Sequence, residues 1–374
     1  MNDLHYMQLA LNLAKETQGQ TSPNPVVGAV LVKNNQIIGL GTHLKAGEAH
    51  AEVIAIDMAK EKSKNATLYV TLEPCSHVGR TQACADYIVQ NNIARVVVAM
   101  LDPNEKVSGL GIEKIREAGI EVELGLLADE AKEINQHYLT SMLNQRPYIT
   151  LKHAISLDGK IATSIGESKW ITSKEARIDV HKDRSLHDSI LVGINTVLAD
   201  NPSLTIRHIQ THKQPIRLIL DTHLKTPLTS KIITDGLSQT WLFVSDKVDK
   251  LLIEKYESFD NVTVYQLKSS QVKLENVLDI LHKKEIRSVY VEGGAHINDS
   301  FLQKGLIDEV NTYIAPMLIG GAKSPTSFQG KGIKHLKDAF QLELKSVKQI
   351  GKDIKIISQK EGQRCSQESL KKKV

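Results

Sequence analysis

The chain has 374 residues, which at about 150 residues per domain favours two or three domains and excludes a single small binding module. Hydrophobic residues make up 41% and charged residues 24%, which excludes a chain that is disordered throughout. The net charge of +4 gives no reason to expect a nucleic-acid partner, and no stretch approaches the ~20 consecutive apolar residues of a membrane span.

Helices and strands are predicted to alternate along the first part of the chain. Apolar spacing predicts, in order, a helix over 4–14, strands over 26–32 and 37–40, a helix over 50–59, a strand over 67–72, a helix over 84–89, a strand over 95–100, a helix over 112–118, a strand over 120–124 and a helix over 128–143. This alternation favours a sheet with helices on both faces. Pro147 should end the last helix, so we place a domain boundary at residue 145.

A second α/β domain is predicted over residues 146–361. Apolar runs predict strands over 148–154, 190–192, 216–220, 240–244 and 288–291, with a helix over 296–304. Residues 362–374 lose the apolar periodicity and end in lysines, so we expect a disordered, solvated tail there.

The chain has three cysteines, Cys75, Cys84 and Cys365, which are too few for a framework of disulfides. The segment Met1–Glu16 mixes polar residues into its apolar positions, so we expect neither a signal peptide nor a transmembrane helix there. We therefore expect a cytoplasmic protein, because in reducing surroundings clustered thiols are more often metal ligands than disulfides.

The residues between His50 and Cys84 predict a zinc site. His50 begins a predicted helix, Cys75 follows a predicted strand, and Cys84 begins the next helix. One imidazole and two thiolates suit Zn²⁺, and three protein ligands leave the fourth position open for water, which is typical of a catalytic rather than a structural site. Zinc can lower the pKa of such a water from ~15.7 towards 7, which makes hydroxide available at neutral pH.

Glu52 is the candidate catalytic acid and base of this site. It stands two residues after His50, and at the first turn of a helix it could reach the metal-bound water without being a ligand. A lone H-x-E pattern or a lone buried cysteine would mean little. Zinc deaminases, however, combine H-x-E with a later P-C-x-x-C, and this chain differs in the longer spacing between its two cysteines.

The motifs His50-Ala51-Glu52, Thr71 to His77, Gly79-Arg80-Thr81 and Cys84 resemble the bifunctional deaminase–reductase family of riboflavin biosynthesis. Further matches over residues 1–360 include Ser22 to Gly28, Asp102-Pro103-Asn104, Arg146-Pro147, Ser168 to Ser173, Asp200-Asn201-Pro202 and Glu292 to Ala295. The resemblance implies a cytidine-deaminase-like three-layer α/β/α domain over 1–145 and a dihydrofolate-reductase-like α/β domain over 146–361. It also implies one Zn²⁺ per chain, NADPH as the second cofactor and, we expect, a homo-oligomer.

In that family the first domain deaminates the diaminopyrimidinone ribosylamine phosphate, and the second reduces the ribosyl group to ribityl. The partner of this chain is then a small phosphorylated pyrimidine, without nucleic acid or membrane. The resemblance implies substrate contacts for Asn24, His77, Arg80, Ser168, Arg184, Leu204, Arg207 and Glu292. It implies cofactor contacts for Ala154, Trp170, Thr196, Asp200, Gly293, Gly294 and Ala295.

The second domain has no G-x-G-x-x-G fingerprint. Gly293 and Gly294 instead stand between a predicted strand and a predicted helix, where backbone amides can meet a phosphate, although glycines in a turn often serve only a tight reversal. Lys152, Asp200 and Glu292 are the ionisable residues expected near the reacting sugar. We take Lys152 as the candidate proton donor, although the sequence alone leaves that role open to any of these three residues.

Two other functions remain compatible with the pattern. The first is a nucleic-acid base deaminase of the tRNA-editing type with a regulatory NADP-binding domain, a class whose basic, aromatic groove is disfavoured by 4% aromatic residues and a charge of +4. The second is an oligomerisation module held together by structural zinc. Tightly bound zinc without hydrolytic activity would point to the second.

Overall fold

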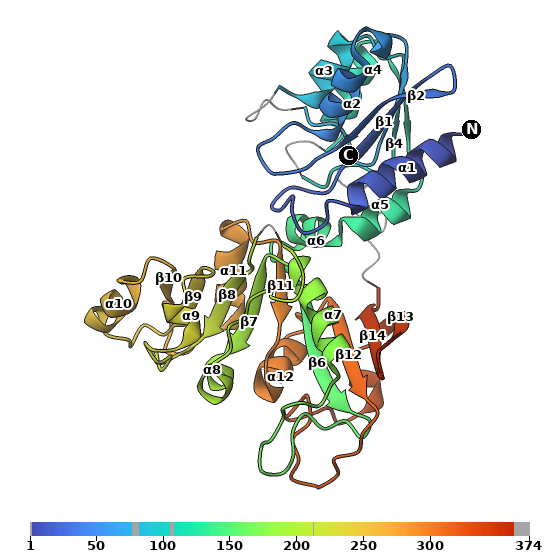
Figure 1. Ribbon diagram of the computed structural model, residues 1–374. Helices are drawn as coiled ribbons and strands as arrows, with labels where there is room; N and C mark the ends of the chain where they lie inside the picture. Colours follow the sequence, from blue (N-terminus) through green and yellow to red (C-terminus); the bar gives the residue numbers. More distant parts are fainter. Residues whose placement is uncertain (1, 77–81, 105–107, 212, 363–374) are drawn as a thin grey trace. The chain divides into compact units, whose positions relative to one another are not determined.

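The computed structural model describes residues 2–76, 82–104, 108–211 and 213–362 (Figure 1). The chain divides into two compact units, the first within Met1–Gln145 and the second beginning at Arg146. In the described residues no helix is long and apolar enough to cross a membrane. Apart from Gly362, the predicted tail lies outside the described residues.

The first unit contains a mixed sheet in the order β2-β1-β3-β4-β5, in which β1 is antiparallel to β2 and β3 and the other neighbours are parallel. Its elements are α1 (Asp3–Lys15), β1 (Gly28–Lys33), β2 (Gln36–Thr42), α2 (Ala51–Ala59), the 3-10 helix η1 (Lys60–Ser63), β3 (Thr67–Val70), α3 (Cys84–Gln90), β4 (Arg95–Val98), α4 (Leu110–Glu117), β5 (Glu121–Leu124), α5 (Ala128–Ile134) and α6 (Gln136–Asn144).

Alternation along β1 supplies both faces of this sheet. Val30 and Val32 pack into one apolar cluster with α1 and α5, whereas Ala29 and Leu31 pack into another with α2, α3 and α4. The first unit is therefore a three-layer α/β/α sandwich, which confirms the predicted fold class. Gly41 matters for the site described below, since a Cβ there would lie 2.0 Å from the Ala51 carbonyl oxygen at the start of α2.

The single helix predicted over 128–143 is wrong, because the chain breaks at Asn135 into α5 and α6. The Asn135 side chain accepts a hydrogen bond from the backbone N–H of Val26 at 2.9 Å and donates to the Val26 carbonyl at 3.0 Å. An asparagine side chain that bonds backbone in this way competes with the hydrogen bonds of a continuous helix. Periodicity alone does not reveal such a break.

The second unit contains a sheet in the order β10-β9-β8-β7-β11-β6-β12-β14-β13. Its elements are β6 (Tyr148–Ser156), α7 (Lys174–Ser185), β7 (Ser189–Gly193), α8 (Ile194–Asp200), β8 (Ile216–Leu220), α9 (Lys231–Thr234), β9 (Thr240–Val244), α10 (Lys250–Glu257), β10 (Val262–Gln266), α11 (Leu274–Lys283), β11 (Ser288–Val291), α12 (Ala295–Gln303), β12 (Glu309–Ala315), the 3-10 helix η2 (Leu336–Asp338), β13 (Leu342–Ile350) and β14 (Asp353–Lys360).

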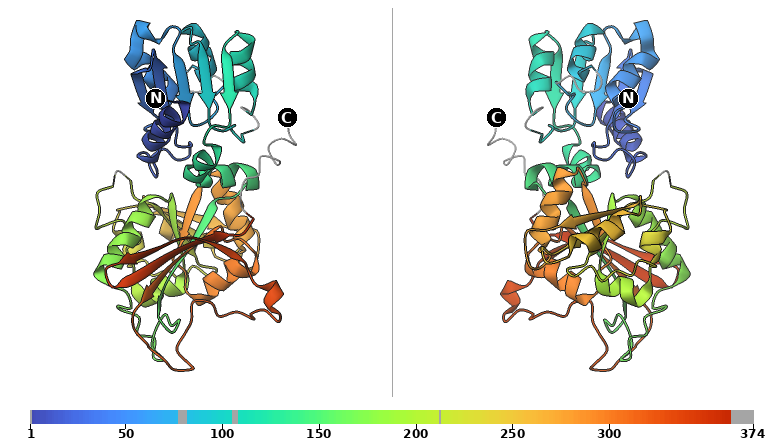
Figure 2. Two further views of the ribbon diagram at one scale, coloured as in Figure 1. Left: turned by 90° about the vertical axis from the view of Figure 1, so that its right-hand side faces the viewer. Right: turned by 90° about the vertical axis from the view of Figure 1, so that its left-hand side faces the viewer.

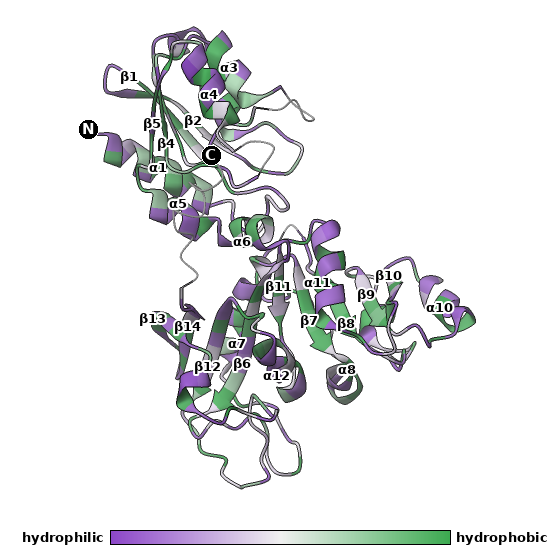
Figure 3. Ribbon diagram, turned by 180° about the vertical axis from the view of Figure 1, so that it is seen from behind, coloured by the Kyte–Doolittle hydropathy of each residue, from purple (hydrophilic) through white to green (hydrophobic). Residues whose placement is uncertain are grey.

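The central strands of this sheet are parallel and buried. β7 is buried along its whole length, and Figure 3 shows β7 and β8 coloured as hydrophobic. Parallel strands covered on both faces have such continuous apolar runs, which is why the sequence predicts them. The result is the predicted α/β fold of the reductase type.

Four strands of this sheet were not predicted, namely β10, β12, β13 and β14. β13 is mostly exposed and reads as alternating charged and apolar residues, so it lacks the apolar run of a buried strand. β13 and β14 form an antiparallel hairpin, shown in red in Figure 2, and β14 also pairs antiparallel with β12. Lys355 of β14 fixes it to α7 through ion pairs of 2.8 Å with Asp179 and 2.6 Å with Asp183.

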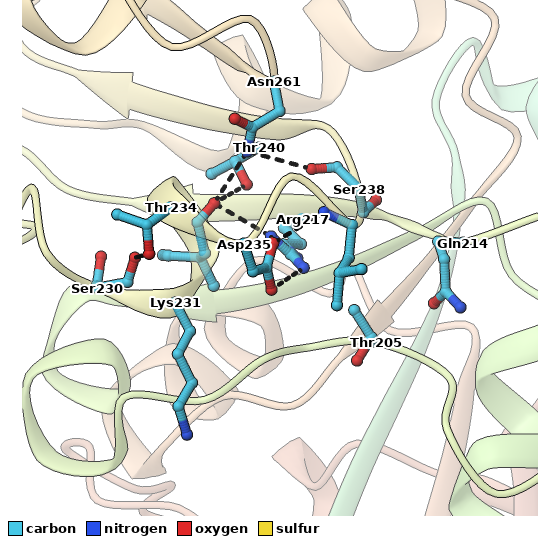
Figure 4. A network of polar contacts seen from close by, with 12 residues as sticks. Thr205, Gln214, Arg217, Ser230, Lys231, Thr234, Asp235, Ser238, Thr240 and Asn261 are labelled. Carbon is cyan, nitrogen blue, oxygen red and sulfur yellow. Dashed lines mark hydrogen bonds and ion pairs between the residues drawn. The ribbon is translucent and has the colours of Figure 1, made fainter.

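A buried arginine ties β8 to the short helix α9. The Arg217 side chain is fully buried; its Nη1 donates to the Ile232 carbonyl at 3.1 Å, and its guanidinium forms two bonds of 2.7 and 2.8 Å with the Asp235 carboxylate (Figure 4). Such a fork-to-fork pair fixes both position and orientation. We infer that it is a structural anchor rather than part of a binding site.

Replacing Arg217 with Met should lower the free energy of unfolding of the second unit by roughly 3 kcal/mol, because the Asp235 carboxylate and the Ile232 carbonyl would lose their buried partner. Both tryptophans, Trp170 and Trp241, belong to this unit, so urea unfolding followed by tryptophan fluorescence reports on it alone. Lys231→Ala, at an exposed neighbour, is the control and should change the value by less than ~0.5 kcal/mol. If the two substitutions lowered the free energy of unfolding equally, Arg217 would not be a structural anchor.

Candidate functional site

Three side chains in the first unit converge as a candidate metal-binding group. His50 is the N-cap of α2, Cys84 is the first residue of α3, and Cys75 follows β3. Their ligand atoms all lie within 4.8 Å of one another. Because the His50 side chain makes no capping bond to α2, its ring is available to face the two thiols.

The distances within the group fit zinc. His50 Nδ1 lies 3.1 Å from Cys84 Sγ and 3.6 Å from Cys75 Sγ, and the backbone N–H of Cys84 donates to Cys75 Sγ at 3.3 Å. The hydrogen bond between the thiols lowers the pKa of Cys75 and raises that of Cys84. One imidazole nitrogen and two sulfurs are the donors that a three-ligand zinc site uses.

Glu52 lies beside this group without belonging to it. It is the second residue of α2 and is only 3% exposed. Burial raises the pKa of its carboxyl to about 7, and the thiol of Cys84 is among its hydrogen-bond partners. A carboxyl with such a pKa can both take up and release a proton near neutral pH.

His43 and Asn24 adjoin the His50 ring. The rings of His43 and His50 meet edge-on with centroids 5.2 Å apart. His43 Nδ1 lies 3.2 Å from the Ala49 carbonyl and therefore carries the proton, so its Nε2 accepts from the Asn24 amide at 3.0 Å. The side-chain oxygen of Asn24, Oδ1, then remains as an acceptor. His77 and Arg80, the other predicted substrate contacts of this unit, lie outside the described residues.

Glu73 is a residue whose role the sequence analysis missed. Its buried carboxylate accepts hydrogen bonds from the backbone N–H groups of Asp102, Gly109, Gly111 and Ile112 at 3.0 to 3.4 Å. It thereby joins the segment before Cys75 to the start of α4. A buried acid directly after a strand was the available signal, since such a group needs partners.

In the second unit, strand pairing brings Lys152 and Glu292 together. Lys152 lies on β6, and Glu292 directly follows β11, whose last residue, Val291, pairs with Leu151. Burial lowers the pKa of Lys152, and the nearby Glu292 carboxylate partly offsets this. Among the described residues no group lies within hydrogen-bond distance of the Lys152 ammonium. Lys152 is half-buried, and an unpaired amine beside a carboxylate is a candidate proton donor.

Arg184 of α7 holds the Glu292 carboxylate. Its Nε and Nη2 donate to Glu292 at 2.6 and 3.0 Å, and its Nη1 donates to the Thr205 carbonyl at 2.8 Å. Against the cost of burial, the charges of Arg184 and Lys152 lower the pKa of Glu292 to about 2. The predicted role of Arg184 as a substrate contact stays a prediction, and the structure adds its pairing with Glu292.

Two helices begin from glycine at the ends of the neighbouring strands β7 and β11. Gly193 precedes α8 and Gly294 precedes α12, and neither helix start has a side-chain cap. A Cβ on Gly293 would lie 2.6 Å from Ile297, so only glycine allows this approach. Uncapped amides at helix starts attract phosphate groups.

Some of the predicted cofactor residues lie on the elements around the ends of β7 and β11. Thr196 stands in the first turn of α8 and Ala154 on β6, on the same strand as Lys152. Lys169, next to Trp170, forms a 2.8 Å ion pair with Asp200, so these two segments do meet. Trp170 is 66% exposed and its ring lies under the Arg177 guanidinium, so it does not belong to the buried core. Ser168 is exposed, and Leu204 is buried with φ 49°.

Comparisons with known proteins cover both units. Residues 1–100 match the family described as the cytidine and deoxycytidylate deaminase zinc-binding region, and residues 147–356 match the RibD C-terminal domain. The chain is 49% identical to the riboflavin biosynthesis protein RibD of Bacillus amyloliquefaciens, over 94% of this chain and 95% of that one. It is 46% identical to RibD of Aquifex aeolicus, over 95% and 97%.

Solved structures agree along the whole chain. Acinetobacter baumannii RibD superimposes with a TM-score of 0.87 at 39% identity, covering 96% of this chain and 98% of that one. The diaminohydroxyphosphoribosylaminopyrimidine deaminase/5-amino-6-(5-phosphoribosylamino)uracil reductase of Thermotoga maritima does so with a TM-score of 0.84 at 34% identity, with the same coverage.

Proposed function

The chain belongs to the RibD family, the bifunctional deaminase/reductases of riboflavin biosynthesis, and from this premise we propose which residues carry each reaction. Residues 1–145 form the deaminase domain and residues 146–361 the reductase domain. The substrate is the diaminopyrimidinone ribosylamine phosphate. We place the enzyme in the cytoplasm, because its adjacent thiols need a reducing compartment to stay free for metal.

In the deaminase domain, His50, Cys75 and Cys84 hold one zinc ion, which when bound supplies an activated water for attack on the ring carbon that carries the amine. Glu52 takes the proton of the attacking water and returns it to the departing amine, so ammonia leaves. The side-chain oxygen of Asn24, whose amide is held by His43, accepts a hydrogen bond from the pyrimidine. His77 and Arg80 contribute the remaining substrate contacts.

In the reductase domain, bound NADPH would supply the hydride for the sugar carbon, and the role of Lys152 is to donate the proton that completes the reduction. Glu292, held by Arg184, keeps the Lys152 ammonium charged and contacts the sugar. Ser168, Leu204 and Arg207 contact the substrate. Ala154, Trp170, Thr196, Asp200, Gly293, Gly294 and Ala295 hold the cofactor. The observation that supports the reductase activity is that Lys152 and Glu292 converge beside α8 and α12, two helices whose N-cap residue is glycine.

A coupled assay tests the proposal. The purified chain is given the diaminopyrimidinone ribosylamine phosphate and NADPH, and ammonia release and NADPH oxidation are followed together. We expect one equivalent of each. Ammonia release without NADPH oxidation would contradict the proposed reductase activity. A parallel assay with tRNA in place of the pyrimidine substrate tests the base-deaminase alternative, which ammonia release from tRNA alone would favour.

Lys152→Met should lower the reductase rate by about 10²- to 10⁴-fold and leave deamination unchanged, because the proton donor is lost. A donor must be protonated, so the wild-type rate should fall as the pH rises through the pKa of Lys152, which burial places below the ordinary lysine range. Lys152→Arg, if active, should move that fall to higher pH. Lys182→Met, on the exposed face of α7, is the control. An unchanged pH profile in Lys152→Arg would contradict the assignment.

We propose that the enzyme is a homo-oligomer joined at β13. In the part of the chain that the structure describes, this strand pairs on one side only, with β14, and it exposes Leu342, Leu344 and Val347. An unpaired edge strand with exposed apolar side chains is typical of an interface. Leu344→Lys should lower the mass measured by light scattering to that of one chain, whereas an unchanged mass would exclude this edge.

A further inference from the structure

A group of nitrogen-bearing side chains lies next to the Arg184–Glu292 pair. His181 stands on α7, three residues before Arg184 and thus on the same face of the helix. The ring of His208 meets the ring of His181 edge-on with centroids 4.7 Å apart. Arg207 adjoins both, because its backbone N–H donates to His181 Nδ1 at 3.4 Å. We call His181, Arg207 and His208 the histidine corner.

Thr205 connects the histidine corner to the proposed reaction site. Its carbonyl accepts from Arg184 Nη1 at 2.8 Å, and its hydroxyl accepts from Arg207 Nη1 at 3.3 Å. The two arginines are therefore neighbours, and the segment that bears Arg207 and His208 is held against α7. The Thr205 side chain is buried, as is Ile206 beside it, so this arrangement is anchored rather than a loose surface loop.

The hydrogen bond to His181 fixes which of its nitrogens is a donor. Nδ1 accepts from a backbone amide, so in the neutral ring the proton must sit on Nε2. His181 as a whole residue is 5% exposed, and no described residue pairs with its Nε2. Burial, with the charges of Arg184 and Arg207 and the nearby His208, lowers the pKa of His181 to about 4, so the ring is neutral at pH 7.

The charges of this region are unbalanced. The Glu292 carboxylate acts on both His181 and Arg207 through its charge, but Arg184 already engages both of its oxygens. Arg207 forms no ion pair among the described residues, and it adjoins a neutral N–H donor and the exposed ring of His208. Unpaired donors gathered around one guanidinium suit an anion with several oxygens, since arginine binds phosphate with two parallel hydrogen bonds.

We propose that His181 and His208 bind the phosphate of the reductase substrate together with Arg207. This inference rests on the proposed function of the second domain and deepens it. His181 Nε2 and His208 donate to phosphate oxygens while Arg207 supplies the charge. Arg184 keeps its place on Glu292, so one arginine serves the sugar side and the other serves the phosphate side.

The test uses the full-length enzyme with the deaminated substrate. His208→Ala, at an exposed site, should raise the KM for this substrate by about tenfold or more, the loss expected for one hydrogen bond to a charged group. The KM for NADPH should not change. His335→Ala, an exposed histidine of the same unit, is the control and should change neither value. A rise in the KM for NADPH would overturn the proposal, because the corner would then bind the phosphate of the cofactor.

Two replacements of His181 separate its donor from its structural role. In His181→Asn the side-chain oxygen can still accept from the backbone of Arg207, but the Nε2 donor is lost, so we expect a folded enzyme with a raised substrate KM. His181→Gln can place a donor near the former Nε2 and should restore part of the affinity. Equal KM values in wild type and His181→Asn would overturn the proposal.

A binding measurement distinguishes failure of this inference from failure of the proposed function. Calorimetry with ribose 5-phosphate, and with ribose as its uncharged control, needs no turnover. We expect wild type to bind only the phosphorylated sugar, and His208→Ala to bind it about tenfold more weakly. An enzyme that oxidises no NADPH yet shows this difference would contradict the proposed function alone. Equal binding by wild type and variant would overturn the histidine corner alone.

Discussion

Replacing Glu52 with Gln is expected to lower ammonia release by about 10²- to 10⁴-fold while zinc stays at one ion per chain. Glutamine has nearly the same shape but cannot carry the proton from water to the departing amine. The buried position of Glu52 beside Cys84 supports this role, as does a carboxyl pKa of about 7. Ammonia release and metal content measured on the same sample decide the matter.

The reductase rate of this variant, supplied with deaminated substrate, should equal that of wild type. Glu48→Gln is a matched control, because Glu48 is an exposed acid shortly before His50. Deamination should then be unaffected. If zinc were lost in Glu52→Gln, Glu52 would be a metal ligand and the proposed proton transfer would be wrong.

Cys84→Ser is expected to abolish zinc binding and deamination while the second domain continues to oxidise NADPH. We expect this only with deaminated substrate, at a rate roughly 10⁴-fold above that with the diamino compound. The two reactions occur at different positions of the molecule, an exocyclic amine and a sugar carbon. Their order must therefore come from recognition rather than from chemistry.

The discrimination follows if the reductase pocket is built to hydrogen-bond the carbonyl that deamination creates. An amine at that position would leave buried donors or acceptors mispaired, which is costly. Glu52→Gln offers an independent check, because it blocks the first reaction without removing the metal. If either variant reduced the diamino compound as fast as the deaminated one, deamination would not have to come first.

The sequence by itself determined the candidate metal-binding residues and the alternation of elements around them. His50 and Cys84 stand where apolar periodicity begins a helix, and Cys75 stands where an apolar strand ends, so short segments suffice to locate all three. The buried parallel strands were predicted for the same reason, because β7 and β8 each contain a run of three apolar residues, 190–192 and 218–220.

Only the tertiary structure decided which distant residues meet. The break at Asn135 depends on a hydrogen bond to Val26, far away in the chain, and the helical period continues across it. β13 depends on β14 for its pairing and lacks a buried face of its own. The partners of Glu73 are backbone amides, which no pattern of side chains reveals.

The reductase site shows the same division. The sequence placed Lys152 within one strand and Glu292 directly after another, but their proximity follows from the pairing of β6 with β11, which are far apart in chain order. The Arg184–Glu292 pair and the contact of His181 with His208 likewise join residues of separate elements. Periodicity reports which face of an element is buried, whereas the choice of neighbour depends on sheet order and packing, which are long-range properties of the folded chain.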